Sequence, residues 1–241
     1  MGNPVLSVSN LCVSFGSRTV IRGLSFKLQQ GDCLAVIGPN GAGKSVLLKA
    51  LLHLVPSPNE IQGEIRWSEN SRLGYVPQRV AADRQLPLRV KDLLEAKARF
   101  LGLPATDVSL VASETRLTTE LVDTRIGVLS GGQLQKVLIA FALLGDPNVL
   151  LFDEPTASLD ELSEERVYES LHSLQKDRRF TVILVSHDLS VVYRYANMVL
   201  CLSKVRTCMG APKEILTPQL LEELYSAPAK YYQHVQEHRN G

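Results

Sequence analysis

A glycine-rich stretch decides the fold, and it reads Gly38-Pro39-Asn40-Gly41-Ala42-Gly43-Lys44-Ser45. The apolar run Cys33-Leu34-Ala35-Val36-Ile37 precedes it, and Val46-Leu47-Leu48-Lys49-Ala50-Leu51-Leu52 follows it. These flanks predict a buried strand that enters a glycine turn and then a helix. The unpaired amides at the start of such a helix, together with its dipole, attract a phosphate group. The stretch is therefore predicted to be a phosphate-binding loop.

The residue types within this loop suit a nucleoside triphosphate. Glycine lets the backbone approach phosphate oxygens that a side chain would keep away. Lys44 is predicted to reach the β and γ phosphates, and the Ser45 hydroxyl to ligate Mg²⁺. The alternative is a glycine-rich turn that merely ends a strand, and the complete spacing with both correct flanks disfavours it. The predicted nucleotide-binding residues here are Gly38, Pro39, Asn40, Gly41, Ala42, Gly43, Lys44, Ser45 and Val46.

Two carboxylates follow a second apolar run, Val149-Leu150-Leu151-Phe152. Such a run is typical of a central parallel strand that is buried on both faces, and open α/β sheets bind ligands where these strands end. Asp153 is predicted to orient magnesium, and Glu154 to polarise the water that attacks the γ phosphate. Acidic residues after a strand often only solvate a loop or cap a helix. The accompanying phosphate-binding loop makes that alternative the weaker one.

A histidine ends a third apolar run, in which Thr181-Val182-Ile183-Leu184-Val185 leads into Ser186-His187-Asp188. His187 is predicted to lie beside the γ phosphate and to hydrogen-bond to it. A lone histidine after a strand is often just a loop residue, so the prediction depends on its position relative to the other motifs.

A second glycine turn, Leu129-Ser130-Gly131-Gly132-Gln133, opens another apolar helical stretch. If that helix begins near Ser130, its first amides can donate hydrogen bonds to a bound anion. The dipole alone contributes about 0.3 to 1 kcal/mol, so other contacts are needed as well.

With these motifs, the chain resembles the nucleotide-binding subunit of ATP-binding cassette (ABC) transporters over nearly its whole length. The resemblance implies that Phe15 stacks on adenine and that Gln78 senses the γ phosphate and the metal. It also implies that His187 is the switch histidine and that Asp160 communicates across a dimer. Val46 stands where threonine is usual, but this departure removes no phosphate ligand. The signature sequence of the family corresponds to Leu129, Ser130, Gly131, Gly132 and Gln133.

The resemblance also implies a fold class. We expect an α/β protein with a RecA-like core, a mixed and largely parallel sheet, an N-terminal antiparallel β subdomain and an inserted helical signature lobe. Residues 1–241 then form one ATPase domain. Its core lobe covers about 1–84 and 145–210, its helical lobe about 85–144, and a polar, helix-tending extension about 211–241.

The resemblance to the family implies two kinds of partner, another copy of the chain and proteins of a membrane. Loop and signature would face each other across a head-to-tail homodimer, with ATP and Mg²⁺ bound between them. Residues 74–79 with 86–92, and 199–202 with 207–212, resemble the zinc and manganese importer ATPases, in particular the zinc-import type. This implies integral membrane permease subunits, indirectly an extracytoplasmic metal-binding protein, and a peripheral location at the cytoplasmic face of the inner membrane. Zinc is the first expectation, and manganese or iron the second.

Composition sets limits on other functions. The 241 residues are 45% hydrophobic and carry a net charge of +1, so no broad basic surface indicates a nucleic-acid partner. The apolar stretch near 137–144 is far shorter than the roughly 20 residues of a membrane-spanning helix. The N-terminus has no basic region followed by an apolar core, so no secretory signal is expected.

The cysteines and the C-terminal histidines carry weaker signals. Cys12, Cys33, Cys201 and Cys208 have no metal-ligand spacing, which favours small buried side chains in a reducing compartment. His234 and His238 would share a helix face and could hold a metal, although a solvated polar tail is the simpler interpretation.

A soluble ABC ATPase is the alternative class. Members that act on ribosomes carry two sets of motifs, and those that repair DNA carry a long coiled coil between loop and signature. This chain has one set and a short intervening lobe, so both are disfavoured, whereas an Fe-S assembly ATPase stays open. A kinase or GTPase would not need the signature turn.

Overall fold

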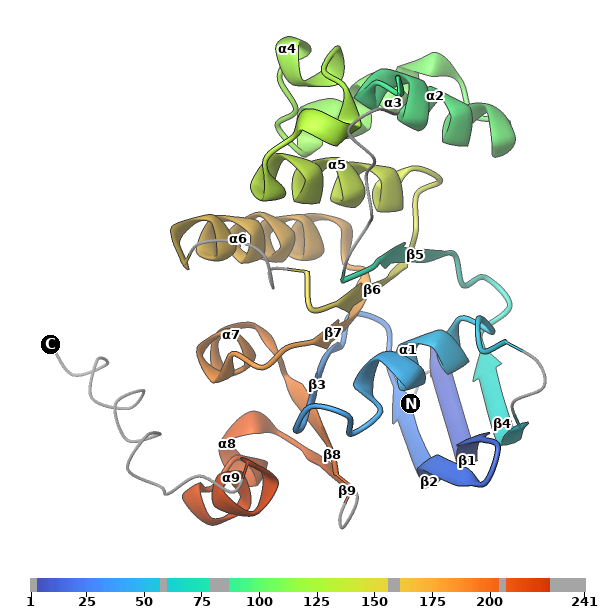
Figure 1. The fold of residues 1–241 in the computed structure, drawn as a ribbon, viewed down its shortest axis with the longest axis vertical. Helices are drawn as coiled ribbons and strands as arrows, with labels where there is room; N and C mark the ends of the chain where they lie inside the picture. Colours follow the sequence, from blue (N-terminus) through green and yellow to red (C-terminus); the bar gives the residue numbers. More distant parts are fainter. Residues whose placement is uncertain (1–3, 57–59, 79–86, 156–160, 204–206, 226–241) are drawn as a thin grey trace, which may run out of the picture. The chain divides into compact units, whose positions relative to one another are not determined.

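The computed structural model describes residues 4–56, 60–78, 87–155, 161–203 and 207–225, which fall into two compact units (Figure 1). The first unit consists of Met1–Glu69 and Ile183–Gly241, and the second of Asn70–Val182. The chain therefore leaves the first unit after residue 69 and returns to it at residue 183.

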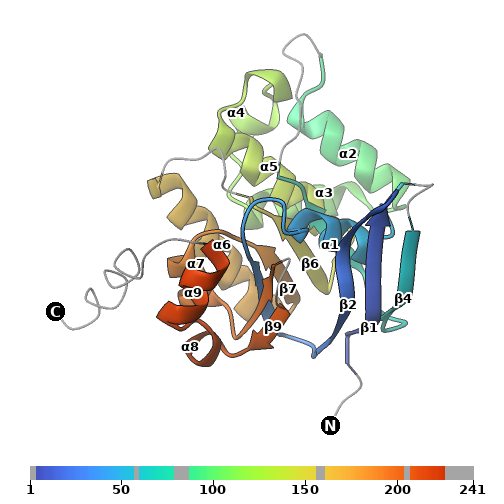
Figure 2. The ribbon, with the colours of Figure 1, turned by 60° about the horizontal axis from the view of Figure 1, so that its bottom comes forward.

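The first unit begins with an antiparallel sheet of three strands in the order β2-β1-β4. Its strands are β1 (Leu6–Phe15), β2 (Arg18–Leu28) and β4 (Glu60–Trp67), seen side by side in Figure 2. Leu6 pairs with Leu28 on one side and with Trp67 on the other. Leu6, Val8, Leu11 and Val13 of the central strand are buried. This sheet confirms the predicted antiparallel β subdomain.

The second sheet is mixed and has six strands in the order β5-β6-β7-β3-β8-β9. β3 runs parallel to β8 and β5 parallel to β6, whereas β9 is antiparallel to β8. Every residue of β3, β6 and β7 is buried, as expected of strands that are covered on both faces. The predicted α/β fold class is confirmed. The strands are β3 (Cys33–Ile37), β5 (Leu73–Val76), β6 (Val149–Asp153), β7 (Thr181–Val185), β8 (Met198–Leu202) and β9 (Thr207–Gly210).

The helices of the first unit include a C-terminal pair that belongs to its core. Leu216, Leu220, Leu221 and Leu224 are buried in one cluster with residues of β3 and β8. The prediction of a helix-tending segment after residue 210 is confirmed, but its description as polar is wrong up to residue 224, because α9 has a fully apolar face. The helices are α1 (Lys44–Leu51), α7 (Leu189–Tyr195), α8 (Pro212–Ile215) and α9 (Pro218–Tyr225).

The second unit carries most of the helix, as predicted from the apolar spacing between residues 90 and 144. Lys97 ties α2 to α5, because its ammonium donates a hydrogen bond to the Phe141 carbonyl and lies 4.4 Å from the centre of the Phe141 ring. None of the helices in the described ranges is long and apolar enough to cross a membrane. The helices are α2 (Val90–Phe100), α3 (Ala105–Glu114), α4 (Thr119–Val122), the 3-10 turn Ile126–Val128, α5 (Gly131–Leu143) and α6 (Glu161–Arg178).

Candidate functional site

The phosphate-binding loop connects β3 to α1 in the first unit. Gly43 precedes the helix, and its carbonyl accepts a hydrogen bond from the Leu47 amide at 2.8 Å. The Lys44 ammonium donates to the carbonyls of Gly38 at 2.9 Å and Pro39 at 3.4 Å, and the lysine is only 6% exposed. A buried positive charge therefore lies inside the loop at the N-terminal end of a helix. Both features favour a bound anion.

Two glycines of the loop are required by their neighbours. A Cβ atom on Gly38 would lie 2.0 Å from the Leu202 carbonyl oxygen, and one on Gly43 would lie 2.8 Å from Val20 Cγ1. Both residues also have positive φ angles, 147° and 101°, which L-residues rarely adopt. In the sequence, these glycines are explained by the need of the backbone to approach phosphate oxygens. The structure gives a second reason, which is the close packing of the loop against β2 and β8.

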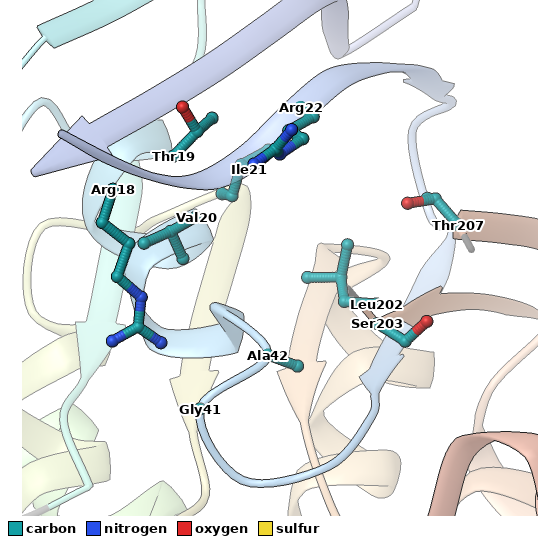
Figure 3. Close-up of a pocket in the computed structure, with 10 residues that line it drawn as sticks. All are labelled: Arg18, Thr19, Val20, Ile21, Arg22, Gly41, Ala42, Leu202, Ser203 and Thr207. Atoms are coloured by element: carbon teal, nitrogen blue, oxygen red, sulfur yellow. The ribbon is translucent and has the colours of Figure 1, made fainter. Parts of the chain in front are cut away.

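A cavity of about 690 Å³ borders the loop, within the size range of small-molecule sites (Figure 3). Gly41 and Ala42 form one side of it, and β2 together with the end of β8 forms the others. The lining residues are Arg18, Thr19, Val20, Ile21, Arg22, Gly41, Ala42, Leu202, Ser203 and Thr207.

Phe15 and Arg18 lie opposite each other where β1 turns into β2. Phe15 is 36% exposed at the end of its strand, and Arg18 extends toward Gly41 in Figure 3. The sequence analysis singled out Phe15 but missed Arg18. The signal was available, because the two residues flank Gly16-Ser17 and a two-residue turn pairs its neighbours.

His187 belongs to the same unit as the loop. The amide of Ser186 donates to the Val36 carbonyl at 3.3 Å, so the chain just before His187 lies beside the last residues of β3. Asp188 caps α7 by accepting a hydrogen bond from the Ser190 amide at 2.7 Å. His187 itself is exposed between these two anchored residues. Phe15, the loop and His187 thus all belong to the first unit.

The second unit holds the predicted hydrolytic residues at the C-terminal end of β6. Asp153 is 4% exposed, and Glu154 follows with a φ angle of 46°. A left-handed backbone costs a residue such as glutamate about 1–2 kcal/mol, and such strain often marks functional sites. Gln78 Nε2 donates to Glu154 Oε2 at 2.7 Å. Two residues 76 positions apart in sequence therefore meet at this edge.

Tyr75 is a further residue of this edge that the sequence analysis did not assign. It lies opposite Leu151 in the parallel pair of β5 and β6, so its side chain is on the same face as Asp153 two residues on. Burial, the charge of Asp153 and a hydrogen bond between the two side chains raise the pKa of Tyr75 to about 12. Tyr75 therefore stays protonated and donates to the carboxylate.

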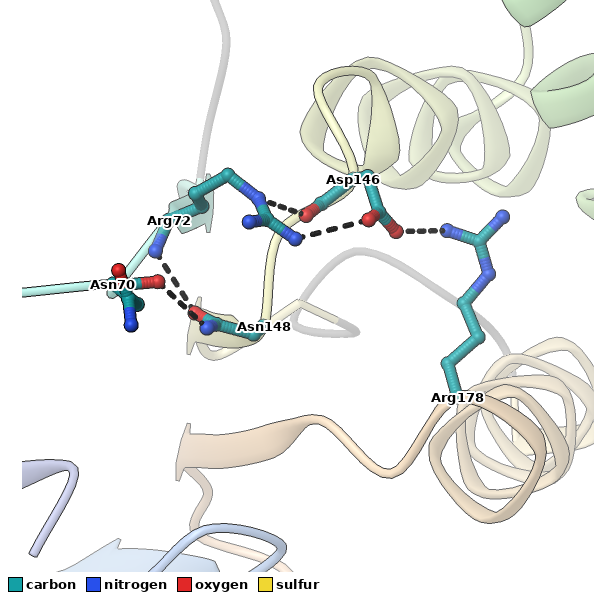
Figure 4. A network of polar contacts seen from close by, with 5 residues as sticks. All are labelled: Asn70, Arg72, Asp146, Asn148 and Arg178. Carbon is teal, nitrogen blue, oxygen red and sulfur yellow. Dashed lines mark hydrogen bonds and ion pairs between the residues drawn. The ribbon is translucent and has the colours of Figure 1, made fainter. Parts of the chain in front are cut away.

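A polar network fixes the register of β5 and β6 at their other ends (Figure 4). The Arg72 amide donates to Asn148 Oδ1 at 2.8 Å, and Asn148 Nδ2 donates to the Asn70 carbonyl at 2.8 Å. The guanidinium groups of Arg72 and Arg178 bind the Asp146 carboxylate at 2.9 and 3.3 Å. Such exposed ion pairs contribute about 0–1 kcal/mol, so the amide bonds of Asn148 to the backbone do more to set the register.

The signature turn has the predicted helix start. Ser130 caps α5, its hydroxyl accepts from the Gln133 amide at 3.3 Å, and Gln133 Oε1 accepts from the Ser130 amide at 2.9 Å. Gly131 and Gly132 form the first turn, and Ser130 and Gly131 are exposed. An exposed first turn leaves room for an anion to approach these amides.

The residues proposed for magnesium have suitable chemistry. Mg²⁺ prefers oxygen ligands, and the hydroxyl of Ser45, the amide oxygen of Gln78 and the carboxylate of Asp153 supply them. No three His, Cys, Asp or Glu side chains cluster as a metal site in the described part of the chain. Asp160, His234 and His238 lie outside the described residues.

Comparison with known proteins shows which family combines these features. Residues 21–157 match the family described as ABC transporter. The chain belongs to the ABC transporter family. As a member with the ATPase motifs of that family, it binds ATP and hydrolyses it in transport.

Individual relatives are similar to this ABC ATPase over most of their length. The zinc import ATP-binding protein ZnuC of Yersinia pseudotuberculosis is 36% identical over 242 residues, which cover 98% of this chain and 93% of the relative. ZnuC of Haemophilus influenzae is 35% identical over 209 residues, 87% of this chain and 75% of the relative.

Solved structures are similar in the same way. A metal-chelate type ABC transporter in an inward-facing conformation has a TM-score of 0.82 and 30% identity, covering 94% of this chain and 90% of that one. CbiO1 from Clostridium perfringens, part of the ABC transporter complex cbiONQ, has a TM-score of 0.75 and 25% identity, covering 98% and 100%.

Proposed function

We propose that this ABC ATPase drives the uptake of a divalent metal ion, zinc before manganese or iron, through a membrane permease. The observation that carries the proposal is similarity to zinc import ATP-binding proteins along the whole chain, 98% of it in one case. A structural neighbour of the metal-chelate type supports the same class of cargo. The cargo does not touch this subunit, so its residues act on ATP alone.

ATP binding is assigned to the first unit. The phosphates would take the place beside Lys44, whose ammonium now bonds to the carbonyls of Gly38 and Pro39. Phe15 would stack on adenine, and Arg18, directly opposite it, adds a positive charge to the cavity. Ammonium and guanidinium groups form strong, charge-assisted hydrogen bonds with phosphate oxygens.

Hydrolysis is assigned to the end of β6. Glu154 would accept a proton from the water that attacks the γ phosphate, and Gln78, now bonded to Glu154, would orient that water and sense the phosphate. Tyr75 holds the carboxylate of Asp153 in place. Ser45, Gln78 and Asp153 would hold magnesium, which would supply positive charge beside the triphosphate. His187 would hydrogen-bond to the γ phosphate.

A head-to-tail homodimer completes the proposed site. The loop of one copy would hold the phosphates, and Ser130, Gly131, Gly132 and Gln133 of the other copy would close over them. The exposed first turn of α5 supports this, because an anion from outside the helix can approach its amides. Asp160 is proposed to communicate between the two copies.

The proposed partners place the ATPase at the cytoplasmic face of the inner membrane. Permease subunits would receive the conformational change there, and an extracytoplasmic metal-binding protein would deliver the ion to them. Coupling requires only that the closed ATP-bound dimer binds the permease differently from the open one.

The test is transport by the chain reconstituted with its cognate permease in lipid vesicles. We expect ATP-dependent uptake of radioactive zinc, competed less well by manganese and iron, and no uptake with Glu154→Gln. An active ATPase complex that carries none of the three metals would reject the proposal.

A further inference from the structure

Two cysteines face each other across the β8–β9 hairpin. Cys201 pairs directly with Cys208, between the pairs Leu200 with Met209 and Leu202 with Thr207. Directly opposite residues of an antiparallel pair point to the same side of the sheet. Both cysteines indeed pack in the same apolar cluster, together with Ile37 and Leu216. The two thiols are therefore neighbours, although six residues separate them in sequence.

Two cysteines paired in this way can form a disulfide if the two strands move slightly closer together. Opposite residues have Cα atoms about 4.5 or 5.5 Å apart, and disulfides span about 4.4–6.8 Å. The Cβ atoms of opposite residues are about 4.5–5.5 Å apart, and a disulfide brings them to about 3.5–4.5 Å. The bond can form, but β9 must move toward β8 by up to about 1 Å.

The four cysteines differ in access and in neighbours. Cys208 is half-buried and Cys201 fully buried, so an oxidant reaches Cys208 first. Cys12 is half-buried as well, but it lies opposite Gln62 in the antiparallel sheet. Cys33 is buried, and burial, followed by the charge of Asp32, raises its pKa to about 12. The sequence-based view of four small buried side chains is therefore wrong for Cys12 and Cys208.

We propose that Cys201 and Cys208 form a reversible disulfide when the protein meets a hydroperoxide. The Cys208 thiolate attacks one oxygen of the peroxide and breaks the O–O bond, which gives a sulfenic acid and hydroxide. The proton that the thiol released converts this hydroxide to water. The sulfur of Cys201 then displaces that hydroxyl group from Cys208, and a second water leaves. In sum, the two thiols lose two protons and two electrons, and these reduce hydrogen peroxide to two waters.

The disulfide would act on the nucleotide cavity, because β8 ends against the phosphate-binding loop. Leu202 follows Cys201, and its carbonyl is the atom that leaves no room for a Cβ at Gly38. Leu202 and Thr207, the next pair after the cysteines, both line the cavity beside Gly41. Drawing the strands together therefore moves the wall of the ATP site. We therefore expect ATP to bind about tenfold more weakly to the cross-linked protein, which corresponds to about 1.4 kcal/mol.

The experiment treats the full chain with hydrogen peroxide and follows thiols and ATP binding together. We expect an intact mass lower by two hydrogens, one cross-linked peptide that joins Cys201 to Cys208, and weaker binding of a fluorescent ATP analogue. Dithiothreitol should reverse all three changes, since a disulfide formed against the strand spacing is readily reduced. The inference concerns ATP binding and does not depend on the transported ion.

Matched variants separate this pair from general oxidation. Cys208→Ser and Cys208→Ala should keep the ATP affinity of the reduced protein after peroxide treatment, whereas Cys12→Ser should respond like the unaltered chain. The proposal is overturned if both thiols of treated protein can still be alkylated after unfolding, if the bond joins other cysteines, or if cross-linked protein binds ATP as well as the reduced form.

Discussion

The phosphate-binding loop and the end of β6 are held in place by different means. Backbone contacts shape the loop, since the Leu202 carbonyl excludes any side chain at Gly38 and Lys44 bonds to two loop carbonyls. Side chains hold the end of β6, where the exposed amide of Gln78 bonds to Glu154 in a strained backbone. The loop is thus held by backbone contacts within the first unit, whereas the Glu154 carboxylate is positioned by one exposed side chain.

This difference leads to an expectation about substitutions. Changes in the loop should alter stability and ATP binding together, because the same contacts serve both. Changes at the end of β6 should alter the rate of hydrolysis and leave stability nearly unchanged.

The largest effect is expected for Glu154→Gln. Glutamine keeps an oxygen that can accept the hydrogen bond from Gln78 but cannot take a proton from water. Phosphate release should therefore fall by about 10² to 10⁴-fold, the range of positioned general bases, while ATP binding and melting temperature persist. Normal hydrolysis by this variant would show that Glu154 is not the base.

Gly38→Ala should be the most damaging change to stability. The new Cβ atom would meet the Leu202 carbonyl at 2.0 Å, so β8 or the loop must shift. We expect a loss of about 2–4 kcal/mol in the free energy of unfolding, measured by urea denaturation, together with weaker ATP binding.

The control for that variant is Gly41→Ala. Gly41 also has a positive φ angle, 76°, but nothing lies within 4 Å of its added Cβ. This substitution should lower the free energy of unfolding by about 1 kcal/mol, because only the backbone conformation is strained. Equal costs for both variants would mean that packing against Leu202 does not shape the loop.

Lys44→Ala should weaken ATP binding. A hydrogen bond to a charged group contributes about 1.5–3 kcal/mol, which corresponds to a Kd about 10 to 100 times higher. Isothermal titration calorimetry with ATP measures this Kd. The matched control is Lys49→Ala, on the exposed side of the same helix. A Kd that rises equally in both variants would argue against a phosphate contact by Lys44.

The smallest effect is expected for Tyr75→Phe. Loss of the hydroxyl removes one hydrogen bond to Asp153, so kcat should fall about 2- to 10-fold and half-maximal activity should need more Mg²⁺. The Mg²⁺ dependence of nucleotide binding provides a second readout. Tyr193→Phe is the control, since its hydroxyl bonds to the Leu216 carbonyl instead and its loss should leave both dependences unchanged.

Local sequence patterns were sufficient for much of the fold. Continuous apolar runs located β3, β6 and β7, and glycine turns located the starts of α1 and α5. These signals come from residues that are close in sequence. An apolar run predicts a strand that is buried on both faces, and a glycine turn predicts the start of a capped helix.

Contacts between distant residues were harder to predict. The left-handed backbone of Glu154 and the bond from Tyr75 to Asp153 depend on how β5 and β6 pair, which no short motif encodes. The apolar face of α9 was missed because its leucines stand among polar residues and become visible only against β3 and β8. Predicted roles in binding and catalysis remain predictions, because they require ATP and a second copy.

The side-chain amide of Asn148 also affects the position of residues at the opposite end of β5. This strand has four residues, so only about 13 Å of extended backbone lies between its end beside Asn148 and its other end, which leads to Gln78. A one-residue slip at Asn148 would turn Tyr75 to the other face of the sheet, away from Asp153. A screen for lost ATPase activity should therefore recover substitutions at Asn148, a residue that no inspection of the reacting atoms would select.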